Sequence, residues 1–166
     1  MSKLTILKDP NPILRQKTVK VKDPLDKKVQ ELIFNMLETM YEANGVGLAA
    51  PQVGSSHRLC VIEADGTQYV LINPQITAKS KDKIISEEGC LSVPGKYFPI
   101  ARHCEVQVRF IDEFGKPAKI KGQGLLARAL QHELDHLDGI IILDRIKKSA
   151  LRQIKKPGIK TKNTKK

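Results

Sequence analysis

The stretch QGLLARALQHELDHL, residues 123–137, repeats apolar side chains at the spacing of a helix and contains the motif HExxH. Residues four apart lie on one face of a helix, so the side chains of His132 and His136 can both reach one metal ion. Glu133 lies beside that face, where its carboxylate can take a proton from water. This stretch therefore predicts a helix that supplies two ligands of a catalytic metal site.

The rest of that metal site has to come from upstream in the chain. A catalytic site of this type has three protein ligands and one open position. Residues 137–166 contain no Glu, no His and no Cys. Besides the carboxylates, the upstream candidates are histidines and cysteines: His57, His103, Cys60, Cys90 and Cys104.

Among the cysteines, Cys90 differs in its surroundings. Cys60 lies in the apolar run RLCVI and Cys104 begins the alternating stretch CEVQVRF, where a small hydrophobic side chain packed in a strand is the ordinary interpretation. Cys90 lies in EGCLSVPG, residues 88–95, where Gly and Pro interrupt the pattern and let the backbone approach a ligand. We therefore expect the Cys90 thiolate to be the third ligand.

This ligand set leaves the identity of the metal open. One thiolate and two imidazoles suit Fe(II), Zn(II), Ni(II) or Co(II), and the softness of the ligands does not choose among them. The 3 cysteines and the absence of a secretion signal indicate a reducing cytosol rather than a disulfide framework.

The segment NGVGLAAPQVG, residues 44–54, has two interpretations. Taken by itself, it is typical of a helix C-cap followed by a turn. Alternatively, Gly45 and Gly47 allow the backbone to lie close to a ligand. A nucleotide-binding loop is disfavoured, because no strand precedes the glycines and no helix pattern follows them.

Three motifs together resemble the peptide deformylase family. They are GVGLAAPQ at residues 45–52, EGCLS at 88–92 and QHELDH at 131–136, in the family's order, within a resemblance that extends from about Leu4 to about Ile146. The resemblance implies an enzyme of the bacterial cytoplasm that removes the formyl group from the N-terminal formyl-methionine of new polypeptides. It also implies Fe(II) as the metal and small sheets wrapped around the HExxH helix.

The same resemblance implies roles for individual residues. Cys90, His132 and His136 hold the metal, and Glu133 acts first as a base and then as an acid. The Gln52 side-chain amide and the Leu91 backbone N–H donate to the developing oxyanion. Contacts with the formyl-methionyl peptide are expected from Val46, Gly47, Gly89, Leu91, Leu125, Ala129 and the stem of Arg102.

Three charged residues near these positions have interpretations of their own. Arg128 is a polar neighbour of the expected apolar slot. For Arg102, an alternative to the slot is a structural ion pair with Glu88. Asp135 points away from the two histidines, so we expect it at the helix surface or behind the ligands.

Two other functions remain as alternatives at this point. An HExxH metallopeptidase is disfavoured by the missing downstream ligand. A basic RNA-binding protein with a structural metal would need a fourth protein ligand, and it would leave Glu133 without a role.

The remaining patterns predict an α+β fold. Apolar residues between 23 and 42 repeat at three and four, which indicates an amphipathic helix. Strand-like runs predict two hairpins. One joins 58–64 to 68–73 through Asp65-Gly66, and the other joins 104–111 to 118–120. We expect small antiparallel sheets packed around the helix at 123–137.

Charge divides the chain in two. Residues 147–166 hold eight Lys, one Arg and no acid, which is +9 of the formal net charge of +11. We expect a catalytic domain at 1–146 and a basic extension at 147–166, partly helical and then disordered. The extension is either a solvated terminus or an electrostatic contact with ribosomal RNA near the exit tunnel. No apolar run reaches the roughly 18 residues of a membrane span, and we expect a monomer.

Overall fold

The structure is a computed structural model that describes residues 3–146. In chain order its elements are the 3-10 helix η1 (Pro12–Arg15), α1 (Lys27–Glu42), β1 (Gly47–Ala49), the 3-10 helix η2 (Ala50–Val53), β2 (Leu59–Ala64), β3 (Thr67–Lys79), β4 (Lys83–Cys90), β5 (Val93–His103), β6 (Glu105–Ile111), β7 (Pro117–Gln123) and α2 (Gly124–Leu137).

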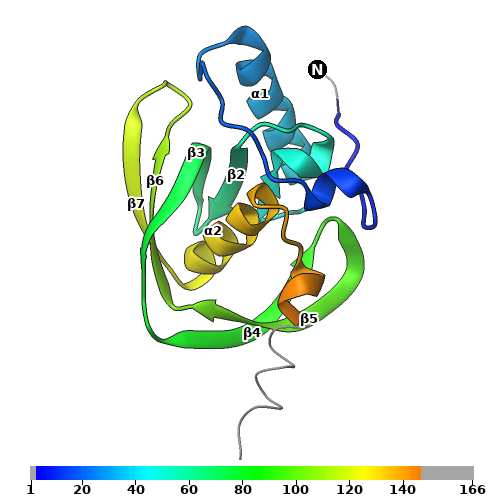
Figure 1. Cartoon of the computed structure of the whole chain (residues 1–166), viewed down its shortest axis with the longest axis vertical. Coiled ribbons are helices and arrows are strands. Elements are labelled where there is room, and N and C mark those ends of the chain that lie inside the picture. Colours follow the sequence, from blue (N-terminus) through cyan, green and yellow to red (C-terminus); the bar gives the residue numbers. More distant parts are fainter. Residues whose placement is uncertain (1–2, 147–166) are drawn as a thin grey trace, which may run out of the picture.

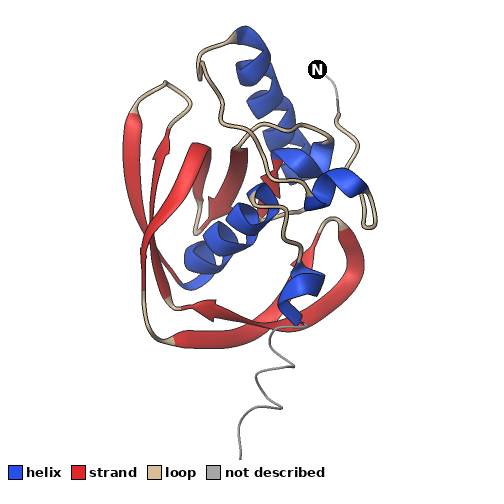
Figure 2. Ribbon diagram, in the orientation of Figure 1, coloured by secondary structure: helices blue, strands red, loops and turns tan. Residues whose placement is uncertain are grey.

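The strands form two antiparallel sheets. The larger sheet has the order β1-β2-β3-β6-β7, and β4 pairs with β5 in a separate hairpin. Figures 1 and 2 show α2 between the two, with β4 and β5 curving below and beside it. The helix contacts strands of both sheets, and most of its residues are buried as a result.

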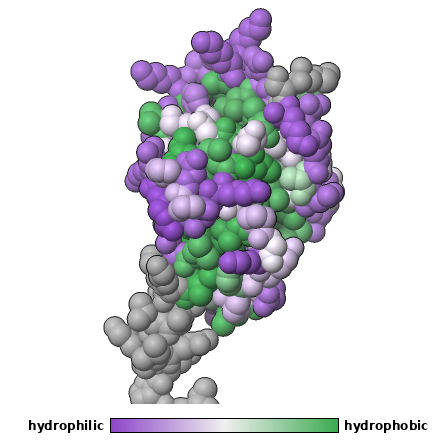
Figure 3. All heavy atoms as spheres, turned by 90° about the vertical axis from the view of Figure 1, so that its right-hand side faces the viewer, coloured by the Kyte–Doolittle hydropathy of each residue, from purple (hydrophilic) through white to green (hydrophobic). Residues whose placement is uncertain are grey.

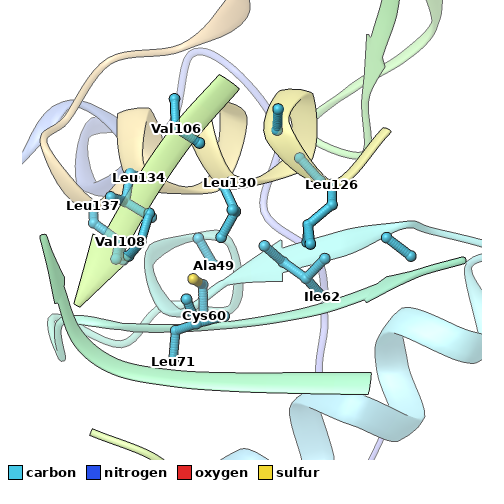
Figure 4. Close-up of a cluster of buried hydrophobic side chains, with 13 residues drawn as sticks. Ala49, Cys60, Ile62, Leu71, Val106, Val108, Leu126, Leu130, Leu134 and Leu137 are labelled. Carbon is cyan, nitrogen blue, oxygen red and sulfur yellow. The ribbon is translucent and has the colours of Figure 1, made fainter. Parts of the chain in front are cut away.

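Strand β2 explains why the larger sheet carries a helix on each face. Side chains alternate along a strand. Cys60 and Ile62 belong to the buried cluster that includes the leucines of α2, which Figure 4 shows packed against the strands. Leu59 and Val61 belong to the cluster that includes the apolar side of α1. The apolar run in β2 is therefore buried on both faces.

The predicted α+β class with small antiparallel sheets is confirmed. The expected turn at Asp65-Gly66 joins β2 to β3, with φ angles of 52° and 75°, as a two-residue hairpin turn requires. Helix α1 begins at Lys27 rather than at residue 23, because the side chain of Asp26 accepts the backbone N–H of Lys28 and caps the helix there.

The hairpin of β4 and β5 was not predicted. Residues 88–95 were expected to be non-periodic, but β4 ends within them at Cys90 and β5 begins at Val93. Most residues of the two strands are exposed or half-buried, so the alternation of apolar and polar residues that marks a strand is absent. Strand β3 also continues to Lys79, beyond the predicted end at residue 73.

The molecular surface carries both apolar and hydrophilic side chains. In the view of Figure 3, apolar surface lies in separate areas between hydrophilic side chains. Among residues 3–146, no helix combines the length and the apolar character needed to cross a membrane. The extension at 147–166, for which a partial helix was predicted, lies outside the described residues.

Candidate metal centre

The three expected metal ligands meet at one point. Cys90 ends β4, and His132 and His136 are one turn apart on α2. His136 Nε2 lies 3.3 Å from Cys90 Sγ and 3.2 Å from His132 Nε2, and all three ligand atoms lie within 4.8 Å of one another. Bonds of about 2.3 Å to sulfur and about 2.1 Å to nitrogen at tetrahedral angles place such atoms about 3.3–3.6 Å apart. The donor set therefore fits one tetrahedral ion.

The other upstream candidates lie outside this group. Cys60 is buried in the apolar cluster beneath α2, and burial raises the pKa of its thiol well above the usual value. Cys104 donates its backbone N–H to the carbonyl oxygen of Asp82. His57 contacts Ser55, and His103 contacts the carbonyl oxygen of Ser80.

A buried carboxylate orients His132. Nδ1 of His132 lies 2.6 Å from Glu88 Oε1, so its Nε2 is the nitrogen that faces the other ligands. Such a carboxylate fixes the tautomer and the direction of a metal-binding imidazole. Burial alone would raise the pKa of Glu88, but hydrogen bonds from His132 and Arg102 outweigh it and lower this pKa to about 2. Glu88 is therefore an anion at neutral pH.

Arg102 does not lie in the pocket wall that the sequence suggested for it. Its side chain is 3% exposed and donates to both oxygens of Glu88, at 3.0 and 2.6 Å, and to Asp135 at 2.6 Å. Asp135 also accepts hydrogen bonds from Arg145. The arrangement is the ion pair given above as the alternative, and Asp135 is buried behind the ligands rather than at the surface.

Replacing Arg102 with methionine is expected to destabilise the fold by about 3 kcal/mol or more. Removing one partner of a buried ion pair leaves the other charge without compensation, at a cost of about 3–5 kcal/mol. Asp135 keeps Arg145 as a partner, which favours the lower end of that range. The free energy of unfolding in urea, measured at one fixed metal concentration, tests this.

The matched control for this variant is Arg109→Met. Arg109 is exposed, and within the described part of the chain its side chain donates only to Gln75, so the loss of this side chain should change stability by less than about 0.5 kcal/mol. Equal unfolding midpoints for the two variants would show that the Arg102 ion pairs contribute no stability.

Glu133 lies on the floor of a pocket, against the backbone of Gly47. The residue is 3% exposed, and among residues 3–146 its carboxylate oxygen Oε2 has no hydrogen-bond partner. A Cβ added at Gly47 would lie 2.5 Å from Glu133 Oε1, so β1 can approach this closely only with glycine there. Burial raises the pKa of Glu133 to about 7, and a cation in the site would lower it.

Three contacts fix the direction of the Gln52 side chain. Oε1 accepts the backbone N–H of Ala49 at 2.9 Å. Nε2 therefore points the other way, donating to Ser92 Oγ at 3.1 Å and directed at Cys90 Sγ at 3.8 Å. The amide presents its N–H groups, not its oxygen, toward the metal centre.

The pocket above these residues has a volume of about 400 Å³. Most residues expected at the site line it, and they come from β1 and the residue before it, η2, the β4–β5 hairpin and α2: Val46, Gly47, Gln52, Gly89, Cys90, Leu91, Leu125, Ala129, His132 and Glu133. His136 is 1% exposed and lies behind this lining.

Five more charged or aromatic residues line the pocket: Glu87, Glu88, Lys96, Tyr97 and Arg128. Two of them gave a signal in the sequence, Arg128 through its place on the HExxH helix and Glu88 as a partner for Arg102. The others lie on the hairpin that the sequence did not predict.

Comparisons with known proteins find similar sequences and similar folds. Residues 3–152 match the family model described as polypeptide deformylase. A peptide deformylase of Thermodesulfovibrio yellowstonii is 49% identical over 151 residues, covering 88% of this chain and 90% of the relative. The crystal structure of peptide deformylase from Thermotoga maritima is similar with a TM-score of 0.85 at 37% identity, covering 88% of this chain and 99% of that one.

A second solved structure gives a comparable match. It is a peptide deformylase from Synechococcus elongatus in complex with actinonin, with a TM-score of 0.83 at 43% identity, covering 86% of this chain and 78% of that one. The family model alone spans most of the chain. The chain therefore belongs to the peptide deformylase family.

Proposed function

We propose that this chain is a metal-dependent hydrolase that removes the formyl group from the N-terminal formyl-methionine of new polypeptides and releases formate. The observation that carries the proposal is the meeting of Cys90, His132 and His136 beside Glu133 at the floor of a pocket. Three ligands leave a position open for chemistry, whereas a structural site is closed by a fourth. Within the described residues, the group of metal ligands has three members.

The protein groups divide the chemistry among them. When bound, the ion would supply polarisation of water and of the formyl carbonyl. Glu133 takes a proton from the attacking water and later delivers it to the departing amine. Gln52 Nε2 and the Leu91 backbone N–H donate to the negative charge that develops on the formyl oxygen. The contact of Gln52 Oε1 with Ala49 supports this role, because it turns the donor end toward Cys90.

The pocket suits a formyl-methionyl peptide. The peptide backbone pairs with the segment at Val46 and Gly47 in the manner of an added strand. Its methionine side chain enters the apolar part of the pocket formed by Leu91, Leu125 and Ala129. Gly89 belongs to the same lining, and a Cβ there would lie 2.7 Å from the ring of Tyr97, so glycine lets that ring lie close over the backbone.

The products of formyl-Met-Ala-Ser test the proposal against the metallopeptidase alternative. Under anaerobic conditions we expect formate and Met-Ala-Ser in equal amounts, measured by a formate assay and by mass spectrometry. Cleavage of the Met–Ala bond, or cleavage of the unformylated peptide, would favour a peptidase and contradict the proposal.

We propose Fe(II) as the metal of this site, with Zn(II), Ni(II) and Co(II) as ions that it can also hold. The support is the mixed thiolate and imidazole donor set, which accepts all four, together with the implication of the family motifs.

Air should distinguish the Fe(II) form from the others. The activity of the Fe(II)-loaded protein is expected to decay in air as the iron and the Cys90 thiolate oxidise, while the Ni(II)-loaded and Co(II)-loaded proteins remain active for longer. The measurement is formate release over time from matched aerobic and anaerobic samples. Equal rates and equal lifetimes for the Fe(II) and Zn(II) forms would contradict the proposal for iron.

We also propose that the chain works as a monomer in the bacterial cytoplasm, with the basic extension at 147–166 in contact with ribosomal RNA near the exit tunnel. The support is the charge of the extension, +9 without an acid, because formyl-methionine appears on chains that are still being made. Contact of this kind is independent of base sequence and weakens steeply with salt.

Deletion of residues 147–166 should separate formate release from binding to the ribosome. The rate on a free formyl-peptide is expected to stay nearly unchanged, since the proposed ligands and proton-transfer group end at His136. Co-sedimentation with ribosomes at low salt should fall. A truncated protein that pelleted with ribosomes as well as the full chain would show that the extension is only a solvated terminus.

A further inference from the structure

A second concave region, with a volume of about 1120 Å³, shares no lining residue with the pocket at the metal centre. Its walls include residues 17–20, parts of β3, β6 and β7, which are neighbours in the larger sheet (Figure 1), and the end of α2 with the segment after it. We call it the basic groove, because its lining holds six cations and two acids: Lys17, Lys20, Arg58, Arg109, Lys119, Arg145, Asp135 and Asp138.

The charge of the groove departs from that of the rest of the catalytic domain. Residues 1–146 hold all 18 acids of the chain and all but nine of its 29 Lys and Arg residues, so this part is close to balanced. The groove takes nearly a third of these cations but only two of the acids. A cleft lined by one sign of charge raises the local concentration of ligands of the opposite sign, so the groove favours an anion.

Both acids of the groove are already paired with arginines. Asp138 Oδ1 accepts a hydrogen bond from Arg58 Nη1 at 2.8 Å. Asp135 accepts hydrogen bonds from Arg145 and from Arg102. The four other cations of the lining are exposed and have no acidic partner within residues 3–146: Lys17, Lys20, Arg109 and Lys119.

Two of these unpaired cations face each other across the sheet. Arg109 of β6 lies directly opposite Lys119 of β7, and like charges in such a cross-strand pair destabilise a sheet. On the β3 side, Arg109 donates to the neutral Gln75, at 3.1 and 2.6 Å. An anion bound between Arg109 and Lys119 would offset a repulsion that no acid of the described chain neutralises.

The size and lining of the groove favour a polymer over a small anion. Pockets for small ligands have volumes of about 300–1,000 Å³, and here the unpaired cations are spread over three separate segments of the chain. Phe110, which is half-buried, also belongs to the lining. A positively charged groove with an aromatic side chain on which a base can stack is typical of proteins that bind single-stranded nucleic acid. In addition, Arg145 lies two residues before the basic extension in the sequence.

We propose that the basic groove binds the phosphate backbone of single-stranded RNA, as a contact separate from the one proposed for the extension. The choice of RNA rests on the proposed function, which places the enzyme at chains that are still being made. Contacts with phosphates carry no sequence information, so the groove binds RNA irrespective of base sequence. Lys17, Lys20 and Lys119 provide the phosphate contacts that an exchange to glutamine removes.

The test is the salt dependence of binding to a fluorescent oligouridine of about 20 nucleotides, longer than the site of one binding domain. Anisotropy titrations use the metal-loaded full chain and the groove variant Lys17→Gln/Lys20→Gln/Lys119→Gln. At about 50 mM salt the variant should bind at least about tenfold more weakly. Its plot of log affinity against log salt should be less steep by about 2, since each phosphate contact contributes about 0.7 for a single strand.

The matched control is Lys27→Gln/Lys28→Gln/Lys81→Gln, which removes the same charge from exposed positions outside both linings. The control should keep the salt slope of the unchanged chain. The proposal is overturned if the groove variant keeps that slope, or if the control loses as much of it as the groove variant does.

Polyglutamate distinguishes RNA from an acidic protein. Its affinity should change by the same factor in the groove variant and in the control, because it responds only to the net charge. If the groove variant lost as much affinity for polyglutamate as for oligouridine, the groove would be a site for an acidic protein and the proposal would be overturned.

Formate release and urea unfolding keep this result distinct from the proposed function. Both variants should release formate as fast as the unchanged chain and unfold at about the same urea concentration, since the exchanged lysines are exposed and lie outside the metal pocket. If no protein released formate, the proposed function would fail. The salt slopes of the folded variants would still decide whether the groove binds RNA.

Discussion

Replacing Cys90 with serine is expected to strip the metal from the protein and to abolish the release of formate. The two remaining ligands, His132 and His136, both come from α2, and two protein ligands hold a divalent ion poorly. Loss of a group that only supports a ligand already costs about 10–100-fold in metal affinity, so the loss of a ligand should cost more than about 100-fold. Elemental analysis after desalting, with a formate assay on the same sample, measures both effects.

The matched control is Cys104→Ser. Cys104 lies between β5 and β6 and does not belong to the ligand group, so this variant should keep both metal and activity. His132→Ala and His136→Ala should behave like Cys90→Ser. Full metal occupancy in Cys90→Ser would mean that the third ligand lies elsewhere.

Glu133→Gln should separate metal binding from catalysis. The amide has the size of the carboxylate and fits the same space beside Gly47, but it cannot move a proton from water to the departing amine. We expect metal content and KM to stay close to those of the unchanged chain while kcat falls by about 10²–10⁴-fold. Steady-state formate release gives kcat and KM, and elemental analysis gives the metal content.

Glu31→Gln, an exposed change on α1, controls for the loss of a negative charge and should leave kcat unaltered. If Glu133→Gln retained a kcat within tenfold of the unchanged chain, another group would have to transfer the proton. Glu88 could not take that role, because its hydrogen bonds with His132 and Arg102 lower its pKa to about 2.

The parts of the site that depend on local spacing could be predicted from the sequence. His132 and His136 share a helix face because they are four residues apart, and that relation holds wherever the helix packs. The place of Cys90 does not follow from local spacing, because its distance from α2 depends on how the hairpin of β4 and β5 packs against that helix. Its position was expected from the absence of a downstream ligand, from its Gly- and Pro-bounded surroundings and from the three family motifs.

Other parts depend on packing that no local pattern reveals. For Asp135 the sequence left two alternatives open, the surface or a place behind the ligands, and it is buried behind them because α2 is enclosed by both sheets. Arg102 was expected beside the pocket because of its apolar stem, whereas β5 turns it toward Glu88 and Asp135. Lys96 and Tyr97 reach the pocket only because of a hairpin with little buried surface to mark it.

One titration tests the central claim most directly: the rate of formate release from formyl-Met-Ala-Ser against the amount of metal returned to chelator-treated protein, under anaerobic conditions. The account predicts an inactive metal-free protein whose activity rises in proportion to bound Fe(II) and reaches its limit at one ion per chain. Formate release by the metal-free protein, or a limit reached only at two ions per chain, would contradict a single site built from Cys90, His132 and His136.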